Sequence, residues 1–207
     1  MTPYAIAIFV HVVGALGLFT AMGVEWVLLA RLSRVQAAEE ARDWLSLLGV
    51  VRRLSPPSLA AILLAGIYMM VTVWGAVAWI VVAFVALLLL PPLGILPGLR
   101  LPGIQRELAE TNGPLSPALQ QRLAEPLFLV SIQIRTAIAL GIVFLMTVKP
   151  DALGSALAIA VAILLGIGGS LPVLNRARGR ASQGAPSAWE GGQQGGVPCT
   201  RTNGCPS

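Results

Sequence analysis

Three ionisable side chains lie inside apolar stretches of this sequence, where charge is costly. His11 and Glu25 both fall within "FVHVVGALGLFTAMGVEWVLLARL" (residues 9–32), and Arg135 falls within a later apolar run. A charged group at the centre of a bilayer costs roughly 2.5–3.5 kcal/mol on insertion scales, so such groups pair, line water or reach towards the surface. These residues are therefore the first candidates for chemistry or for helix pairing.

Glu25 and Arg135 are predicted to form an ion pair between two helices. Glu25 lies six residues inside Arg31, roughly 9 Å at 1.5 Å per residue, and Arg135 lies eight residues inside Leu127, roughly 12 Å. Measured from the same membrane face, the two depths nearly match. The pair either joins the helices structurally, as buried pairs often do, or forms part of a proton or ion relay.

His11 is the only histidine of the chain and lies near the opposite end of the same apolar segment. Met69, Met70 and Met146 are expected at comparable depth on other helices. Imidazole with thioethers could ligate Cu(I) or supply axial ligands to a haem. The alternative is a hydrogen-bonded structural histidine. His11 and Glu25 are 14 residues apart, which places them on one helix stripe but roughly 21 Å apart, so they are not one site.

Composition indicates which elements must position these residues. The chain is 56% hydrophobic and only 11% charged, with a mean hydropathy of +0.81. Soluble domains carry about 25% charged residues, so the bilayer is the solvent. A spanning helix needs roughly 20 mostly apolar residues. The sequence therefore predicts an all-α polytopic transmembrane bundle (residues 1–174) of five spans, at about 4–30, 58–74, 78–97, 127–148 and 152–172.

The basic residues predict the orientation. All 14 Lys and Arg residues except Lys149 and Arg135 fall in the loops 31–57 and 98–126 or in the C-terminal tail. Positive residues accumulate in cytoplasmic loops, so we expect the N-terminus outside, the C-terminus inside and a multi-pass location in the bacterial cytoplasmic (inner) membrane. Because these arginines are scattered over loops rather than gathered on a folded face with aromatics, nucleic acid is not an expected partner.

Several connecting segments also carry structural signals. Residues 37–54 mix charges with leucines and suit a short helix lying in the membrane interface. Ser116 and Pro117 predict a helix start, and that helix is expected to continue into the fourth span with a kink at Pro126. "PPLGILPG" (residues 91–98) is expected to break the inner end of the third span.

The chain changes character after its last span. Residues 175–207 are rich in Gly, Ser, Pro and Gln and predict a disordered cytoplasmic tail. Cys199 and Cys205 lie in this tail, and two thiols fall short of the four ligands of a zinc site. We expect both to be reduced and unconstrained.

The last span carries a ridge of small residues at four-residue spacing. Such ridges let helix backbones approach closely in lipid. The ridge predicts a packing seam, either within the bundle or with a second copy or another membrane partner. Its members are Gly154, Ala158, Ala162, Gly166 and Ser170.

Two stretches carry a resemblance to known proteins. "FVHVVGALGLFTAMGVEWVLLARL" and "LLAGIYMMVTVWGAVAW" resemble small bacterial polytopic membrane proteins of unknown function, which share an early H-x-x-G and an L-x-G-[IL]-Y step. More distantly, residues 5–150 resemble the membrane domains of copper-resistance protein D-like and haem-carrying bundles. The resemblance implies a helical bundle and, in those relatives, haem or copper.

No soluble-enzyme motif is present: the sequence has no Walker A loop, G-x-S-x-G, H-E-x-x-H or Rossmann glycines. We therefore expect no catalytic residue and no obligatory cofactor. The primary expectation is an accessory or helix-packing protein of the membrane. The alternatives are an ion or small-solute transport component that uses Glu25 and Arg135, and a haem- or copper-binding redox module centred on His11.

Overall fold

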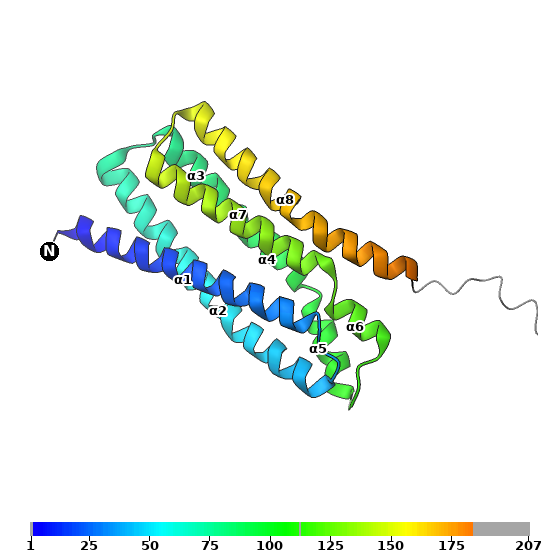
Figure 1. Ribbon diagram of the computed structural model, residues 1–207. Helices are drawn as coiled ribbons and strands as arrows, with labels where there is room; N and C mark the ends of the chain where they lie inside the picture. Colours follow the sequence, from blue (N-terminus) through cyan, green and yellow to red (C-terminus); the bar gives the residue numbers. More distant parts are fainter. Residues whose placement is uncertain (1, 112, 184–207) are drawn as a thin grey trace, which may run out of the picture.

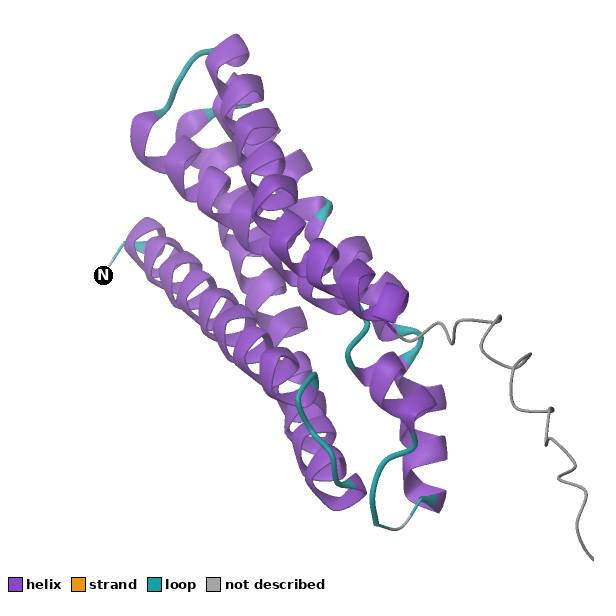
Figure 2. Cartoon of the chain, turned by 45° about the vertical axis from the view of Figure 1, so that its right-hand side comes forward, coloured by secondary structure: helices purple, strands orange, loops and turns teal. Residues whose placement is uncertain are grey.

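The chain folds as an elongated bundle of helices (Figures 1 and 2). A computed structural model describes residues 2–111 and 113–183, and these residues contain no strand. The helices are α1 (Pro3–Leu32), α2 (Ala38–Met69) with a π-helical turn η1 (Met70–Trp74), α3 (Ala78–Leu88), α4 (Leu90–Gly98), α5 (Leu101–Glu110), α6 (Pro117–Leu123), α7 (Pro126–Val148) and α8 (Ala152–Gln183).

Five segments are long and apolar enough to cross a membrane. They are Pro3–Leu32, Ala38–Trp74, Ala78–Glu110, Pro117–Val148 and Ala152–Pro172. The predicted all-α multi-pass bundle is therefore confirmed. The order of the spans is as expected, whereas several of their boundaries are not.

Helix α2 is continuous from the first loop into the second span, so the separate interfacial helix expected over 37–54 is wrong. Pro56 and Pro57 lie inside α2 and remove two backbone donors, yet the helix continues. Packing against α1 explains this: a Cβ atom on Gly14 would lie 3.0 Å from the Ser58 carbonyl oxygen, and one on Gly17 would lie 2.6 Å from the Ser58 hydroxyl. The two glycines thus let α1 support α2 directly beyond the prolines.

The first half of α2 packs with α5 and α6 into a folded extension of the bundle, which we call the Arg end. Arg42 of α2 donates from Nε to the Leu108 carbonyl (3.2 Å) and from Nη2 to the Thr111 carbonyl (2.6 Å). Its interior is made of leucines. Those almost fully buried include Leu45, Leu48, Leu108, Leu119 and Leu123.

Helices α6 and α7 are separate, so the expected continuous helix with a kink at Pro126 is wrong. The predicted start of α6 is confirmed, because the Ser116 side chain accepts a hydrogen bond from the Leu119 amide at 3.2 Å. The helix ends at Leu123, and Glu125 is extended, with ψ of 123°. A residue before proline avoids the helical conformation, so Pro126 begins α7 rather than bending α6.

The break expected in the third span is present. Helix α3 ends at Leu88, α4 begins at Leu90, and Pro91 and Pro92 follow at once. The two prolines cannot donate to the carbonyls of the preceding turn, which interrupts the ladder there. The turn expected near Gly75 is also present, since Gly75 has a φ of +70° that suits glycine.

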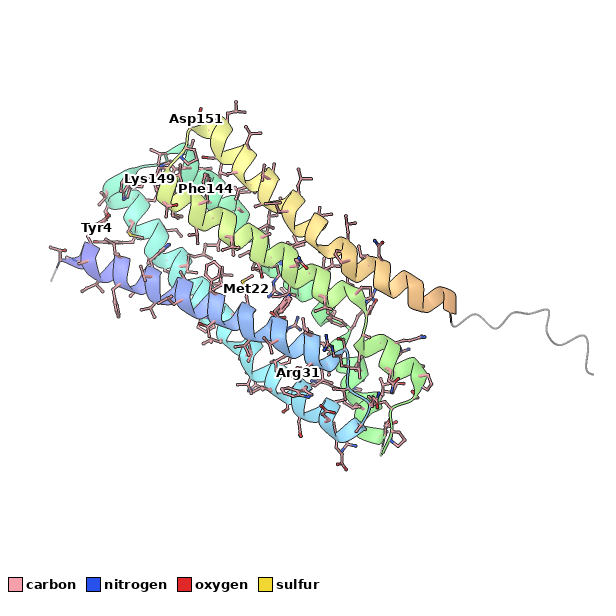
Figure 3. All side chains as sticks on the ribbon, viewed as in Figure 1. Tyr4, Met22, Arg31, Phe144, Lys149 and Asp151 are labelled. Carbon is pink, nitrogen blue, oxygen red and sulfur yellow. The ribbon has the colours of Figure 1, made fainter. Side chains whose placement is uncertain are left out.

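At the opposite end of the bundle, which we call the Lys149 end, aromatic side chains gather around the Lys149 ammonium. Lys149 ends α7 in a left-handed conformation, and its ammonium lies 4.2 Å from the Trp74 ring centroid and 5.9 Å from that of Trp79. Trp74 Nε1 donates to the Tyr4 hydroxyl at 3.3 Å. Figure 3 shows Tyr4 and Lys149 at this end and Arg31 at the other.

The ridge of α8 packs inside the bundle, against α7. A Cβ on Gly166 would lie 3.0 Å from Ile134 Cα, and one on Gly141 would lie 2.9 Å from Ala162 Cβ. Gly154 and Ala158 are only half-buried, and Gly154 lies beside the turn that precedes α8. The buried stripe is therefore offset from the predicted ridge at its first positions; it consists of Ser155, Ile159, Ala162, Gly166 and Ser170.

Helix α8 continues to Gln183, so the predicted start of the tail at residue 175 is wrong. Arginine and alanine, which are frequent between 176 and 181, are strong helix formers, and this explains the continuation. The rest of the predicted tail, with Cys199 and Cys205, lies outside the described residues.

The glycines of α8 give a direct test of this packing. Gly166→Leu should lower the thermal unfolding temperature in detergent micelles, because overpacking a tight contact costs typically about 1–3 kcal/mol. Gly168→Leu is the matched control, because nothing lies within 4 Å of its Cβ position and leucine favours helix. Equal unfolding temperatures for the two variants would contradict the α7–α8 seam.

Candidate functional site

The carboxylate of Glu25 is the centre of the candidate site. The residue is 2% exposed and lies on the face of α1 that is turned into the bundle. Arg135 of α7 donates from Nη2 to Glu25 Oε2 at 2.5 Å, and its side chain is 10% exposed. The structure thus brings together the two residues expected to pair between the first and fourth spans.

Arg52 is a third member of the site, and sequence reasoning missed it. Its Nε donates to Glu25 Oε1 at 3.0 Å, and its Nη2 donates to the Gly94 carbonyl at 3.2 Å. The sequence predicts a loop at residue 52, whereas α2 is continuous and carries this residue alongside α1. The sequence would predict Arg52 next to Glu25 only if the second helix were extended towards the N-terminus through Pro56 and Pro57.

Two glycines of α4 make room for the two guanidinium groups. A Cβ on Gly94 would collide with Arg135 Nη1, and one on Gly98 would lie 2.7 Å from Arg52 Nη1. The four-residue spacing places both glycines on one face of α4. The two glycines of this G-x-x-x-G pattern therefore contact charged side chains, whereas in such patterns the glycines commonly contact the backbone of a neighbouring helix.

The site carries a net positive charge. Glu25 is shared by Arg52 and Arg135, so two cations face one anion. Several other carboxylates of the described residues are engaged elsewhere. Glu40 accepts from Trp44, Glu107 pairs with Arg122, Glu125 pairs with Arg100, and Asp151 accepts from the Gly154 amide.

These three charged residues line a hollow of about 520 Å³, which we call the arginine cavity. Residues of α1, α2, α4 and α7 line it, most of them from α2 and α4. Apart from the charged groups and Ser55, its walls are apolar or glycine. They include Leu18, Pro56, Leu59, Leu90, Ile95 and Leu99.

His11 lies in a second hollow of about 470 Å³, the histidine cavity. Its Nδ1 lies 3.1 Å from the Ile62 carbonyl, and because a carbonyl only accepts, Nδ1 carries the hydrogen. In a neutral imidazole, Nε2 is then left as an acceptor or ligand. The methionines expected at comparable depth line the same hollow, whose other lining residues include Trp74, Trp79 and Lys149; these methionines are Met69, Met70 and Met146.

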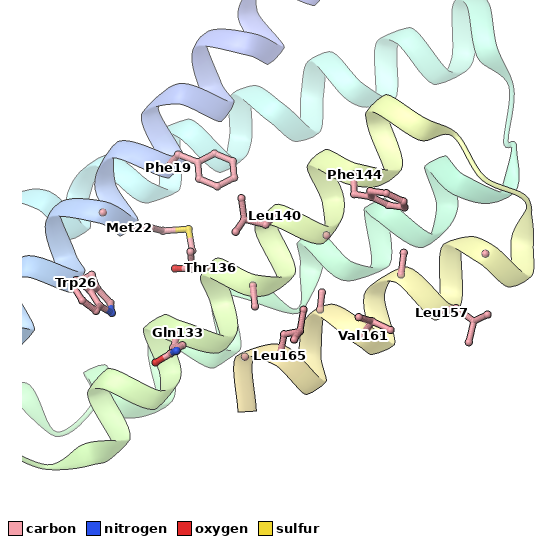
Figure 4. A pocket seen from close by; sticks show the side chains of 17 residues that line it. Phe19, Met22, Trp26, Gln133, Thr136, Leu140, Phe144, Leu157, Val161 and Leu165 are labelled. Atoms are coloured by element: carbon pink, nitrogen blue, oxygen red, sulfur yellow. The ribbon is translucent and has the colours of Figure 1, made fainter. Parts of the chain in front are cut away.

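The largest hollow is a groove of about 940 Å³ on the side of the bundle formed by α1, α7 and α8 (Figure 4). Phe19 and Met22 approach Leu140 and Thr136 across it, and Gln133 lies further along α7. No titratable side chain lines it. The groove therefore supplies no ionisable group for chemistry.

Comparison with known proteins gives no match: no protein-family model, no curated protein and no solved structure is similar to the chain. The resemblance to copper-resistance protein D-like and haem-carrying bundles stays a prediction. Function must therefore be argued from the two cavities and the charges that line them.

The ion cluster predicts a specific pattern of stabilities. Glu25→Gln should destabilise the protein by about 3–5 kcal/mol, because it leaves two guanidinium groups without their counter-charge. Adding Arg135→Gln should recover part of the loss by removing the more buried of the two cations. Thermal unfolding in micelles, followed by tryptophan fluorescence, measures both effects.

Glu107→Gln is the matched control for this experiment. Its ion pair with Arg122 is exposed at the protein surface, and exposed pairs contribute about 0–1 kcal/mol. A double variant Glu25→Gln/Arg135→Gln that is no more stable than Glu25→Gln would count against the interhelical pair.

Proposed function

We propose that this chain is a multi-pass protein of the bacterial cytoplasmic membrane that binds a small organic anion in the arginine cavity, as an ion or small-solute transport component. One observation carries the proposal: two guanidinium groups share a single carboxylate on the wall of an open, apolar-walled cavity. The expected role as an accessory protein, in which the cluster only joins helices, is the alternative.

The charge balance favours an anion as the ligand. A structural pair needs one arginine for one carboxylate, whereas this site has one arginine in excess. Guanidinium groups are planar forks that bind carboxylates and similar oxyanions through two parallel hydrogen bonds. Ionisable residues within a membrane typically mark substrate or ion pathways. The excess cation therefore supports a bound oxyanion.

The remaining walls favour an organic ligand over a bare inorganic ion. Leu59, Ile95 and Leu99 line the cavity together with the two arginines. An inorganic anion would leave water there and gain nothing from these side chains, whereas an apolar body would bury them. A small carboxylate or sulfonate with a hydrocarbon body satisfies both parts of the cavity.

The orientation belongs to the same proposal. The Arg end contains most of the basic residues of the described chain, and positive residues accumulate on the cytoplasmic side. The arginine cavity would then lie near the cytoplasmic face and the histidine cavity near the outer face. No catalytic residue is proposed.

Arg52 allows the binding proposal to be tested without removing the buried pair. We expect p-toluenesulfonate to bind the purified protein in a calorimetric titration, and Arg52→Gln to weaken binding about 10- to 100-fold, since a charged hydrogen bond contributes about 1.5–3 kcal/mol. Arg52→Lys should give an intermediate affinity because it keeps the charge and loses the fork.

Arg122→Gln is the matched control, because Arg122 forms an exposed ion pair away from the cavity. Its affinity for p-toluenesulfonate should equal that of the unaltered protein. Absence of binding to a folded protein, or equal weakening by Arg122→Gln and Arg52→Gln, would leave the accessory role in place.

The histidine cavity favours a second candidate, a Cu(I) site. The chemistry of the donors fits this ion, because thioethers are soft ligands and the Ile62 carbonyl fixes the tautomer that leaves His11 Nε2 available. His11, Met69, Met70 and Met146 would hold the ion, and bound copper would supply electron transfer. The fit to haem is poorer, since the chain has one histidine.

Copper binding has its own test. Protein reconstituted with Cu(I) under reducing, anaerobic conditions should retain about one copper per chain after gel filtration, as a site of this donor set implies. His11→Ala and the Met69→Leu/Met70→Leu double variant should lose it. Retention below a tenth of a copper, together with no Soret absorption in protein purified from cells supplied with haem, would exclude the redox candidate.

A further inference from the structure

The arginine cavity and the histidine cavity adjoin at two shared lining residues. Leu18 of α1 and Leu90 at the start of α4 line both hollows, and they are the only residues that the two linings share. A residue that lines two cavities lies between them. Both leucines are buried, 8% and 6% exposed, so both belong to the wall that separates the cavities.

The position of Leu18 on α1 explains how it reaches this wall. It lies seven residues after His11 and seven before Glu25, or roughly 10 Å along the helix from each. Seven residues make nearly two turns, so the three side chains share one stripe. Leu18 therefore lies midway along α1 between His11 of the histidine cavity and Glu25 of the arginine cavity.

Leu90 lies where the third span is interrupted. The break between α3 and α4 falls immediately before it, and Pro91 follows it. Chain breaks of this kind are where helix segments change direction relative to each other. A shift of α4 against α3 would thus move Leu90 directly.

The ionisable groups on the two sides of this wall are mainly cationic. Lys149 lines the histidine cavity, and Arg52 and Arg135 line the arginine cavity with Glu25. No second carboxylate lines either hollow. A molecule moving from one hollow to the other would meet positive charge at both ends, which favours an anion.

We propose that the two cavities form one transmembrane pathway for the organic anion, closed at mid-depth by a hydrophobic barrier of Leu18 and Leu90. This inference rests on the proposed anion site at Arg52 and Arg135. It adds the route of the anion through both cavities and a gate, which is the pair Leu18 and Leu90. Apolar constrictions close pathways by excluding water. Shortening the two side chains widens the constriction and lowers the barrier.

The test is efflux of p-toluenesulfonate from preloaded proteoliposomes. This anion stays ionised and does not cross the lipid as a neutral acid. Leu18→Ala/Leu90→Ala should accelerate efflux about tenfold, which corresponds to ~1.4 kcal/mol off the barrier. Leu18→Phe should slow it, and the volume-conserving Leu18→Met/Leu90→Met should leave it unchanged.

Leu16→Ala/Leu88→Ala is the matched control, because these neighbouring leucines are 63% and 51% exposed and line neither cavity. Equal efflux from this control and from the alanine pair at the barrier would overturn the gate. If the alanine pair fails to fold, Leu18→Phe alone decides: unchanged efflux in a folded protein overturns the proposal.

The two proposals fail separately. Calorimetric binding that depends on Arg52, combined with efflux that ignores the size of residues 18 and 90, would leave the anion site standing without the gate. Efflux that depends on these residues but not on Arg52 would support a pathway and remove the anion site.

Discussion

The burial of the Glu25 carboxylate among apolar helices is the constraint on which the rest of this structure depends. Removing a charge from water costs several kcal/mol unless partners compensate for it, so the fold must deliver cations to that point. Arg135 comes from α7 and Arg52 from α2, while α4 contributes two glycines that seat the guanidinium groups. One carboxylate thus fixes how α1, α2, α4 and α7 meet.

The same constraint explains why the arginine cavity lies between α2 and α4. Helix α1 packs mainly on α2, and α7 packs mainly on α8, each pair through small residues (Figure 2). Where α2 faces α4, by contrast, the contact includes the Arg52 side chain, which bridges to the Gly94 carbonyl. The two guanidinium groups need more space than a helix contact made of small residues allows. The arginine cavity therefore follows from the way the charge is neutralised.

Sequence reasoning reached the features that depend on local chemistry or on membrane depth. The helix start at Ser116, the break before Pro91 and the pairing of Glu25 with Arg135 are of this kind, because capping, missing donors and matched depth can all be read from one chain. It missed Arg52, because continuity of α2 through Pro56 and Pro57 depends on α1, whose Gly14 and Gly17 admit Ser58. Because this support comes from another helix, the sequence of α2 alone does not predict that the helix continues through its prolines.

The two arginines differ in how deeply they are buried, and the proposed anion site depends on this difference. Arg135 is the more buried, 10% exposed against 25% for Arg52, and its contact with Glu25 neutralises a charge that must be compensated whenever the protein is folded. That leaves Arg52 as the cation in excess, held by α1 and α4 yet reachable from the cavity. A site built in this way can bind and release an anion while its structural ion pair stays intact. A single arginine could not both neutralise Glu25 and bind the anion. A ligand that displaced it from Glu25 would leave the buried carboxylate with the full cost of desolvation.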